Sequence, residues 1–210
     1  MKKFIYAILL LLSAAATASV SNVVFVAFDV ETTGFSPDSD RIIEIGAVKS
    51  RNGEILETAQ WLINPGIPIR NFDVHGITDE QVAESPAFAE AYRAFKAFAG
   101  DGVLIAHNAS FDVRFMAAEI KRNELKPIPN ATLNSLTLFR RWYPAAPSHK
   151  LGELATELGI PVATEHRARD DAETLLNILA HGLKRHPEAT LEQIRATANG
   201  TYHFDGSHRQ

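Results

Sequence analysis

The sequence lacks cysteine, and it lacks any excess of positive charge. Without cysteine the chain forms no disulfide and carries no thioether-linked lipid. Lys and Arg total 21 against 25 Asp and Glu, a formal net charge of −4, so no overall positive field attracts nucleic acid. Contact with a polyanion must therefore be local. The remaining composition, 46% hydrophobic and 22% charged over 210 residues, indicates one globular domain and excludes a disordered or collagenous chain.

The first twenty residues differ from the rest of the chain. Two lysines precede an apolar run over residues 4–12, and small residues including Ala16-Thr17-Ala18 follow. This order is typical of a secretory signal peptide and predicts that residues 1–18 are removed by cleavage after Ala18. The alternative is an uncleaved membrane anchor, because the uncharged stretch 4–20 has 17 residues, at the lower limit for spanning a bilayer.

Beyond this leader the order of expected elements predicts an α/β fold. Three strands come first, at 23–29, 41–50 and 55–63, and the Asn52-Gly53 dipeptide between the last two is a strong hairpin signal. Helices and short strands then alternate, which indicates a sheet with a hairpin on one side and helices against its faces. The expected helices are 87–99, 110–122, 135–142, 150–158 and 169–185, and the expected strands are 103–106 and 131–133.

The domain organisation follows from what interrupts the chain. After the leader we find no internal repeat, low-complexity tract or linker. We therefore expect a single domain over residues 19–186, followed by a helical or flexible tail over residues 187–210.

Two carboxylates, Asp29 and Glu31, stand where the first strand ends. Strand side chains alternate, so both leave the same face of the sheet. Two like charges held this close repel, which is tolerable if they share a metal ion or if one keeps its proton. The following Thr32-Thr33-Gly34 supplies hydroxyls and a turn residue that lets backbone approach a ligand closely. Taken alone, the pattern also fits a solvated strand end.

A second polar segment, residues 107–112, joins a short strand to a helix. Ser110 is expected to cap this helix, which puts Asp112 in the first turn, where the helix dipole favours a carboxylate. The helix dipole alone therefore explains an aspartate at this position, with no functional site. The site interpretation places Asp112 opposite the Asp29 and Glu31 pair, because ligands gather at the ends of neighbouring strands in open α/β sheets.

A third segment, residues 166–172, opens the last long helix. Asp171 lies about 90° from the centre of the helix's apolar stripe and Asp170 about 170° away, so Asp171 belongs to the rim of the buried face and Asp170 is expected to be solvated. If His166 and Asp171 serve one site, His166 must precede the regular helix. Otherwise a single histidine in a loop is expected to be exposed and to have no functional role.

Together these segments resemble the motifs of the DEDDh 3′-to-5′ exonuclease family, which includes the proofreading subunit of bacterial DNA polymerase III. Residues 28–34 match the first motif, 107–112 the second and 166–172 the third, while 74–80 is similar to the family's connecting segment. The resemblance covers about residues 23–179. It implies a ribonuclease H-like mixed sheet with an N-terminal three-strand antiparallel part and flanking helices.

The resemblance also implies a catalytic set. Asp29, Glu31, Asp112 and Asp171 would hold two divalent cations, Mg²⁺ or Mn²⁺, since hard oxygen ligands suit hard ions. Such ions activate a water and stabilise the leaving 3′-oxygen, while His166 takes the proton of the attacking water. The expected activity is hydrolysis of phosphodiester bonds at the 3′ ends of DNA or RNA, with release of 5′-mononucleotides.

Substrate-binding residues follow from the same resemblance. Thr32, Thr33 and Phe35 would hold the terminal nucleotide, with Phe35 against its base. Asn108 and Phe111 would line the same pocket, although Phe111 equally fits the core. Basic side chains available for backbone phosphates, with a solvated surface as their default role, are Arg114, Arg140, Arg141, Lys150, Arg167 and Arg169.

One position departs from the family. Many relatives carry an aspartate just before the residue that corresponds to Ser135, whereas this chain has Asn134. The difference concerns local packing and substrate grip, and it leaves the expected metal ligands unchanged.

Location and partners complete the expectations. The leader predicts an exported enzyme, periplasmic or secreted, that acts on nucleic acid and keeps no stable membrane association; the sequence leaves any protein partner unidentified. One alternative is a cytoplasmic proofreading subunit, in which residues after about Pro187 bind a polymerase. Another is a catalytically silent nucleic-acid-binding module, a class that usually loses a metal ligand or the histidine.

Overall fold

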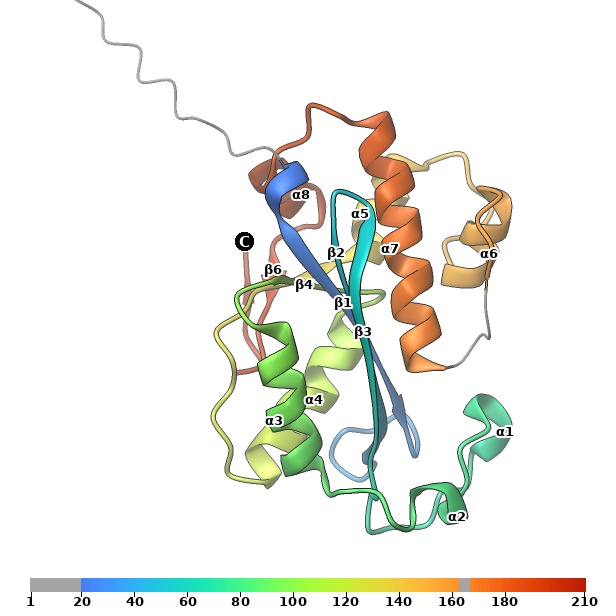
Figure 1. Cartoon of the computed structure of the whole chain (residues 1–210), viewed down its shortest axis with the longest axis vertical. Helices are drawn as coiled ribbons and strands as arrows, with labels where there is room; N and C mark the ends of the chain where they lie inside the picture. The colour runs from blue at the N-terminus through green and yellow to red at the C-terminus, as the bar shows by residue number, and fades with distance from the viewer. Residues whose placement is uncertain (1–19, 163–166) are drawn as a thin grey trace, which may run out of the picture.

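The structure is a computed structural model that describes residues 20–162 and 167–210 (Figure 1). The expected signal peptide over residues 1–18 and the expected catalytic residue His166 lie outside the described residues. Within the two described ranges, no helix combines the length and apolarity that crossing a bilayer requires.

One mixed sheet forms the centre of the molecule, with strand order β3-β2-β1-β4-β5-β6-β7. Strands β1, β2 and β3 are antiparallel neighbours, β4 and β5 continue parallel to β1, and β6 and β7 return antiparallel. The predicted mixed sheet with an antiparallel three-strand part is therefore confirmed. The strands are Val24–Thr32 (β1), Ile42–Arg51 (β2), Glu54–Leu62 (β3), Val103–Ala106 (β4), Thr132–Asn134 (β5), Thr201–Tyr202 (β6) and His208–Arg209 (β7).

The turn between β2 and β3 shows why the hairpin was predictable. Asn52 and Gly53 have φ of 52° and 79°, so both central residues of the two-residue turn are left-handed. Asparagine and glycine are the residues that adopt this conformation at low cost, and the resulting twist matches that of the flanking strands.

The longer helices match their predicted ranges to within two residues. They are Phe88–Ala99 (α3), Ser110–Arg122 (α4), Ser135–Trp142 (α5), Leu151–Glu157 (α6) and Ala168–Arg185 (α7). The sequence did not predict the single-turn helices Phe72–His75 (α1) and Asp79–Val82 (α2), nor a 3₁₀ turn at Val20–Asn22. These elements are too short for the 3.6-residue period to become visible.

Alternation along β1 divides the core into two layers. Val26, Phe28 and Val30 pack with α3 and α4, whereas Phe25 and Ala27 face α5, α6 and α7. Figure 1 shows α7 on one side of the sheet and α3 and α4 on the other. The odd-numbered series continues past residue 27, so the acidic residues at the end of β1 leave the sheet on the side of α7.

Residues 187–210 extend the sheet and the core. Helix α8, Leu191–Thr197, packs by its C-terminal end against Arg141, and β6 pairs with β5. Between β6 and β7, the buried ring of Phe204 lies 5.6 Å from that of Phe28. The sequence did not predict β6 and β7, because a strand of two residues carries no alternation to read.

Candidate active site

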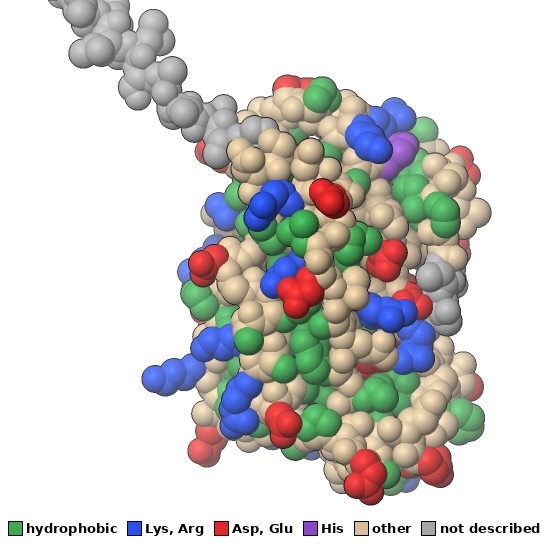
Figure 2. All heavy atoms as spheres, in the orientation of Figure 1, with side chains coloured by type: hydrophobic (Ala, Val, Ile, Leu, Met, Phe, Trp, Pro, Cys, Tyr) green, Lys and Arg blue, Asp and Glu red, His purple; other side chains and the backbone are tan. Residues whose placement is uncertain are grey.

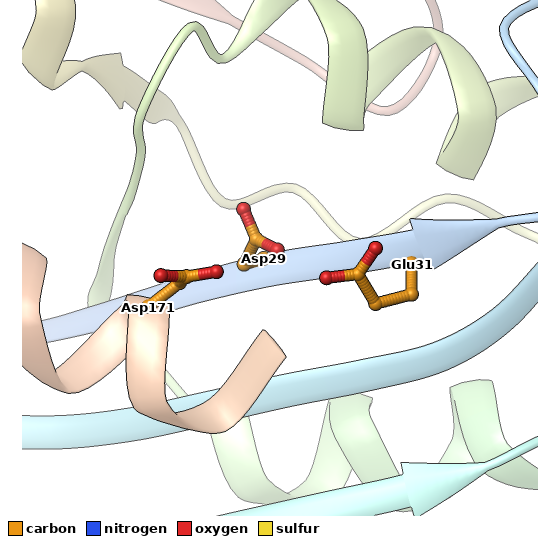
Figure 3. A group of neighbouring side chains, drawn as sticks. All are labelled: Asp29, Glu31 and Asp171. Atoms are coloured by element: carbon orange, nitrogen blue, oxygen red, sulfur yellow. The ribbon is translucent and has the colours of Figure 1, made fainter. Parts of the chain in front are cut away.

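Three carboxylates from two elements meet beside β1. Asp29 and Glu31 come from the strand and Asp171 from the first turn of α7, and one carboxylate oxygen of each lies within 4.8 Å of the others. Figure 3 shows the Asp171 side chain extending from its helix alongside the two strand residues. The structure thus brings together residues that are about 140 positions apart in sequence.

A close approach of helix to sheet produces this convergence. On β2, Gly46 pairs with Asp29. A Cβ atom at residue 46 would overlap the backbone of Ala168 and Arg169, so the first turn of α7 lies directly on this glycine. Because the absent side chain lets the helix backbone touch the sheet, Asp171 reaches Asp29.

Glu44, the partner of Glu31 on β2, is a fourth carboxylate of this region that sequence reasoning did not single out. It is fully buried and accepts hydrogen bonds from Gln60, from the Arg167 guanidinium at 2.9 Å and from the Ala168 amide at 3.0 Å. The available signal was an acidic residue within the apolar first half of β2, since a buried charge requires partners.

Asp112 approaches from α4, the helix on the opposite face of the sheet. It is only 2% exposed and lies in the first helical turn, as predicted, but it is not a member of the 4.8 Å group among the described residues. The predicted capping role of Ser110 is wrong: Ala109 occupies the cap position, and the Ser110 hydroxyl faces Asn108 instead of a backbone amide. The helix starts one residue earlier than a serine cap requires.

Burial and mutual repulsion raise the pKa values of this cluster. Burial, with repulsion from Glu44, Asp171 and Asp112, raises the pKa of Glu31 to about 8. Burial also raises the pKa of Asp29 well above its usual value, with Asp112 the largest charge contribution. For Asp112, burial raises the pKa to about 7 against backbone hydrogen bonds that lower it. A divalent cation would offset the repulsion among these half-buried carboxylates, so the residues fit a hard metal ion.

The loop after β1 holds the first group of predicted substrate-binding residues. The Thr32 hydroxyl donates to the Gly34 carbonyl at 2.6 Å, and the Thr33 hydroxyl accepts from the Arg41 amide at 3.0 Å. Both hydroxyls therefore brace the loop. Phe35 is 84% exposed, an unusual environment for a large apolar ring, and lies three residues beyond the end of β1.

Asn108 and Phe111 flank the start of α4. Asn108 adopts a left-handed conformation with φ of 60°, which turns the chain from β4 into the helix. The Phe111 ring is partly buried and lies 4.9 Å from the ring of Phe115. Phe111 thus packs on the core and still reaches the surface beside Asp112.

Asp170 is not solvated, contrary to the prediction from the helical wheel. It is 9% exposed and receives two hydrogen bonds from Arg169, at 2.9 and 2.6 Å. The neighbouring arginine folds over a carboxylate that points away from the apolar stripe. Asp170 does not belong to the 4.8 Å group, so the assignment of Asp171 to the cluster is unaffected.

Several of the basic candidates already have protein partners. Arg167 pairs with Glu44 and Lys150 with Glu153, Arg114 donates to the Ser110 carbonyl, and Arg141 donates to carbonyls at the end of α8. Figure 2 shows Lys and Arg interspersed with Asp and Glu over the visible face.

Asn134 and His107 both make hydrogen bonds with the start of α5 or with residues near it. The Asn134 side chain accepts from the Leu136 amide at 3.1 Å and caps α5, a task that an aspartate performs equally. Burial lowers the pKa of His107 to about 4, so the ring is neutral. Its Nε2 donates to the His149 carbonyl at 2.8 Å, which leaves Nδ1 to accept from the Ser135 hydroxyl at 2.9 Å.

The carboxylates gathered beside β1 could hold a metal ion. Residues 26–179 match the model of the exonuclease family RNase_T, and the chain belongs to this family. The resemblance to DEDDh exonucleases is thereby confirmed.

Named relatives agree with this assignment. The chain is 40% identical over 169 residues to DNA polymerase III PolC-type of Clostridium perfringens, a match covering 78% of this chain and 11% of that protein. The chain spans about a tenth of the length of such relatives.

Solved structures share the fold. Exonuclease X in complex with 5′ overhanging duplex DNA aligns with a TM-score of 0.68 and 25% identity, covering 83% of this chain and 99% of that one. The nuclease domain of 3′hExo, a DEDDh family member bound to rAMP, aligns with a TM-score of 0.71 and 20% identity, covering 80% and 95%. The predicted ribonuclease H-like architecture is confirmed.

Proposed function

We propose that this chain is a metal-dependent 3′-to-5′ exonuclease that releases 5′-mononucleotides from the 3′ ends of DNA or RNA. The convergence of Asp29, Glu31 and Asp171 within 4.8 Å, in a domain of the exonuclease family, is the observation that carries the proposal. One solved structure of the same fold holds duplex DNA and another holds rAMP, a nucleoside monophosphate like the proposed product.

The carboxylates would hold two divalent cations, Mg²⁺ or Mn²⁺. The donor set consists of carboxylate oxygens alone, from Asp29, Glu31, Asp112 and Asp171, which suits hard ions. When bound, such ions supply Lewis-acid chemistry, which activates a water and neutralises charge on the scissile phosphate. The protein's own part is to hold these four groups close together, where burial and mutual repulsion raise the pKa values of Asp29, Glu31 and Asp112 and so favour neutralisation by a cation.

The remaining steps use nearby side chains. His166 would take the proton of the attacking water. It immediately precedes Arg167, whose side chain pairs with Glu44 beside the carboxylate cluster. The exposed ring of Phe35 would pack on the terminal base, and the braced turn at Thr32 and Thr33 would hold its sugar and phosphate.

We also propose that the enzyme is exported, an inference supported by the sequence of residues 1–18. The second candidate is a cytoplasmic proofreading exonuclease that assists a polymerase, and the 40% identity to a PolC-type DNA polymerase III favours it. Cell fractionation followed by N-terminal sequencing separates the two. A chain that starts at residue 19 in the periplasm or medium supports export, whereas an intact Met1 in the cytoplasm contradicts it.

Hydrolysis of end-labelled oligonucleotides tests the activity. With Mg²⁺ or Mn²⁺, a 3′-labelled strand should lose its label at once as a mononucleotide, while a 5′-labelled strand should shorten in a ladder. Chelator should stop both reactions. Binding of the oligonucleotides without any metal-dependent product would identify a silent binding module instead.

A further inference from the structure

Glu44 ties the central sheet to the start of helix α7. Its Oε1 accepts from Arg167 and its Oε2 from the backbone amide of Ala168, and Gln60 on β3 holds Oε1 from the other side. The Ala168 amide is among the first N–H groups of a helix, which have no partner within the helix itself. A carboxylate placed there satisfies this donor and faces the positive end of the helix dipole.

We call the contacts of Glu44 with Arg167 and Ala168 the clamp. Ala168 lies three residues before Asp171 in sequence. Residues 168 and 171 are one helical turn apart, so fixing the backbone at residue 168 fixes the side of the helix from which Asp171 extends. Gly46, two residues along the same face of β2 from Glu44, brings the same turn into direct backbone contact. Glu44 and Gly46 are also the strand partners of Glu31 and Asp29, so clamp and cluster share one piece of sheet.

Both oxygens of Glu44 are engaged with protein donors. We propose that Glu44 is a positioning residue for the nuclease reaction: by holding Arg167 and Ala168, it sets where α7 presents Asp171 to Asp29 and Glu31. The inference rests on the proposed metal-dependent function, and it goes further by assigning a role to a residue outside the metal-binding set.

A role through charge alone is the competing explanation. In that case Glu44 would attract cations simply as one more negative group near the cluster. The two explanations make opposite predictions for Arg167: removing a positive charge should strengthen cation binding if charge decides, and should weaken it if the clamp decides.

The first experiment compares Glu44→Gln with the wild-type full chain. Titration calorimetry measures Mn²⁺ affinity without nucleic acid, and steady-state kinetics on a labelled oligonucleotide gives kcat and KM separately. We expect Mn²⁺ affinity or kcat to fall about 10- to 100-fold, the usual effect of removing a group that orients metal ligands, with KM nearly unchanged. Wild-type affinity and kcat in Glu44→Gln would overturn the proposal.

Glu119→Gln is the matched control. Glu119 is another buried carboxylate, 3% exposed, and pairs with Arg122 at 2.9 Å near the end of α4, about two helical turns from Asp112. The same substitution there should lower the melting temperature and leave Mn²⁺ affinity and kcat unchanged. Equal losses in both variants would show that Glu44 acts only through general stability.

Arg167→Met distinguishes positioning by the clamp from an effect of charge alone, and it still tests the proposal if Glu44→Gln fails to fold. The side chain is partly exposed, so methionine is accommodated. The clamp predicts weaker Mn²⁺ binding, and a loss in the double variant Glu44→Gln/Arg167→Met that is smaller than the product of the two single losses, since both changes break the Glu44–Arg167 contact. Unchanged or tighter Mn²⁺ binding in Arg167→Met refutes positioning. A wild-type chain that neither binds Mn²⁺ nor hydrolyses oligonucleotides would instead overturn the proposed function itself.

Discussion

Replacing Asp112 by asparagine should stabilise the metal-free protein at pH 8 while it abolishes hydrolysis. Burial raises the pKa of Asp112 from its usual 3.8 to about 7, so the folded chain resists ionising a carboxyl that the unfolded chain ionises freely. Asparagine keeps one acceptor oxygen for the backbone hydrogen bond at Val30 and carries no charge to bury.

The size and pH dependence of this effect follow from linkage. At about 1.4 kcal/mol for each pKa unit, the raised pKa corresponds to about 4 kcal/mol of lost stability above pH 7. Below the unfolded pKa of 3.8 the carboxyl is protonated in both states and the penalty is absent. The penalty therefore grows between pH 3.8 and 7, and stability falls as pH rises through this window.

Urea unfolding with a chelator present measures the difference. At pH 8 the asparagine variant should unfold at a higher urea concentration than wild type, and at pH 4 the two midpoints should converge. Adding Mn²⁺ should raise the urea midpoint of wild type more than that of the variant, because only the wild-type chain keeps the complete ligand set. An asparagine variant that is equally or less stable at pH 8 without metal would refute the claim that ionised Asp112 is held at a cost in stability.

Other substitutions test the geometry. Asp171→Ala should abolish hydrolysis with the fold retained by circular dichroism, whereas Asp170→Ala should keep most of the activity; equal loss in an oligonucleotide assay would contradict the helical-face assignment. Gly46→Ala should displace the start of α7 from the sheet, because the added methyl group overlaps its backbone. We expect the free energy of unfolding in urea to fall by about 1–3 kcal/mol and Mn²⁺ binding to weaken; wild-type Mn²⁺ affinity would show that this close contact does not position Asp171. Phe204→Ala should destabilise the chain by about 3–5 kcal/mol through the cavity it leaves beside Phe28, and a change below 1 kcal/mol would mean that residues 187–210 contribute little to the core.

Helices, turns and strand alternation could be predicted from the sequence because each depends on residues that are close together along the chain. The predicted limits of α4 and α5 agree with the structure, and the Asn52-Gly53 turn has the backbone that its residues favour. The alternation that places Asp29 and Glu31 on one face is equally local. Such features depend on neighbours within a few residues, which a sequence displays directly.

Features that depend on distant partners were not readable. Asp170 is covered because Arg169 folds over it, and a helical wheel gives the direction of a side chain but not what lies above it. Glu44 stands 123 residues from Arg167, so nothing near it in sequence announces its partner. Strands β6 and β7 exist only because β5 offers an edge, and two residues show no pattern of their own.

Anomalous diffraction from crystals soaked in manganese shows whether these carboxylates bind metal ions. We expect two peaks within bonding distance of the carboxylates of Asp29, Glu31, Asp112 and Asp171. Peaks elsewhere, or none beside these side chains, would contradict this expectation.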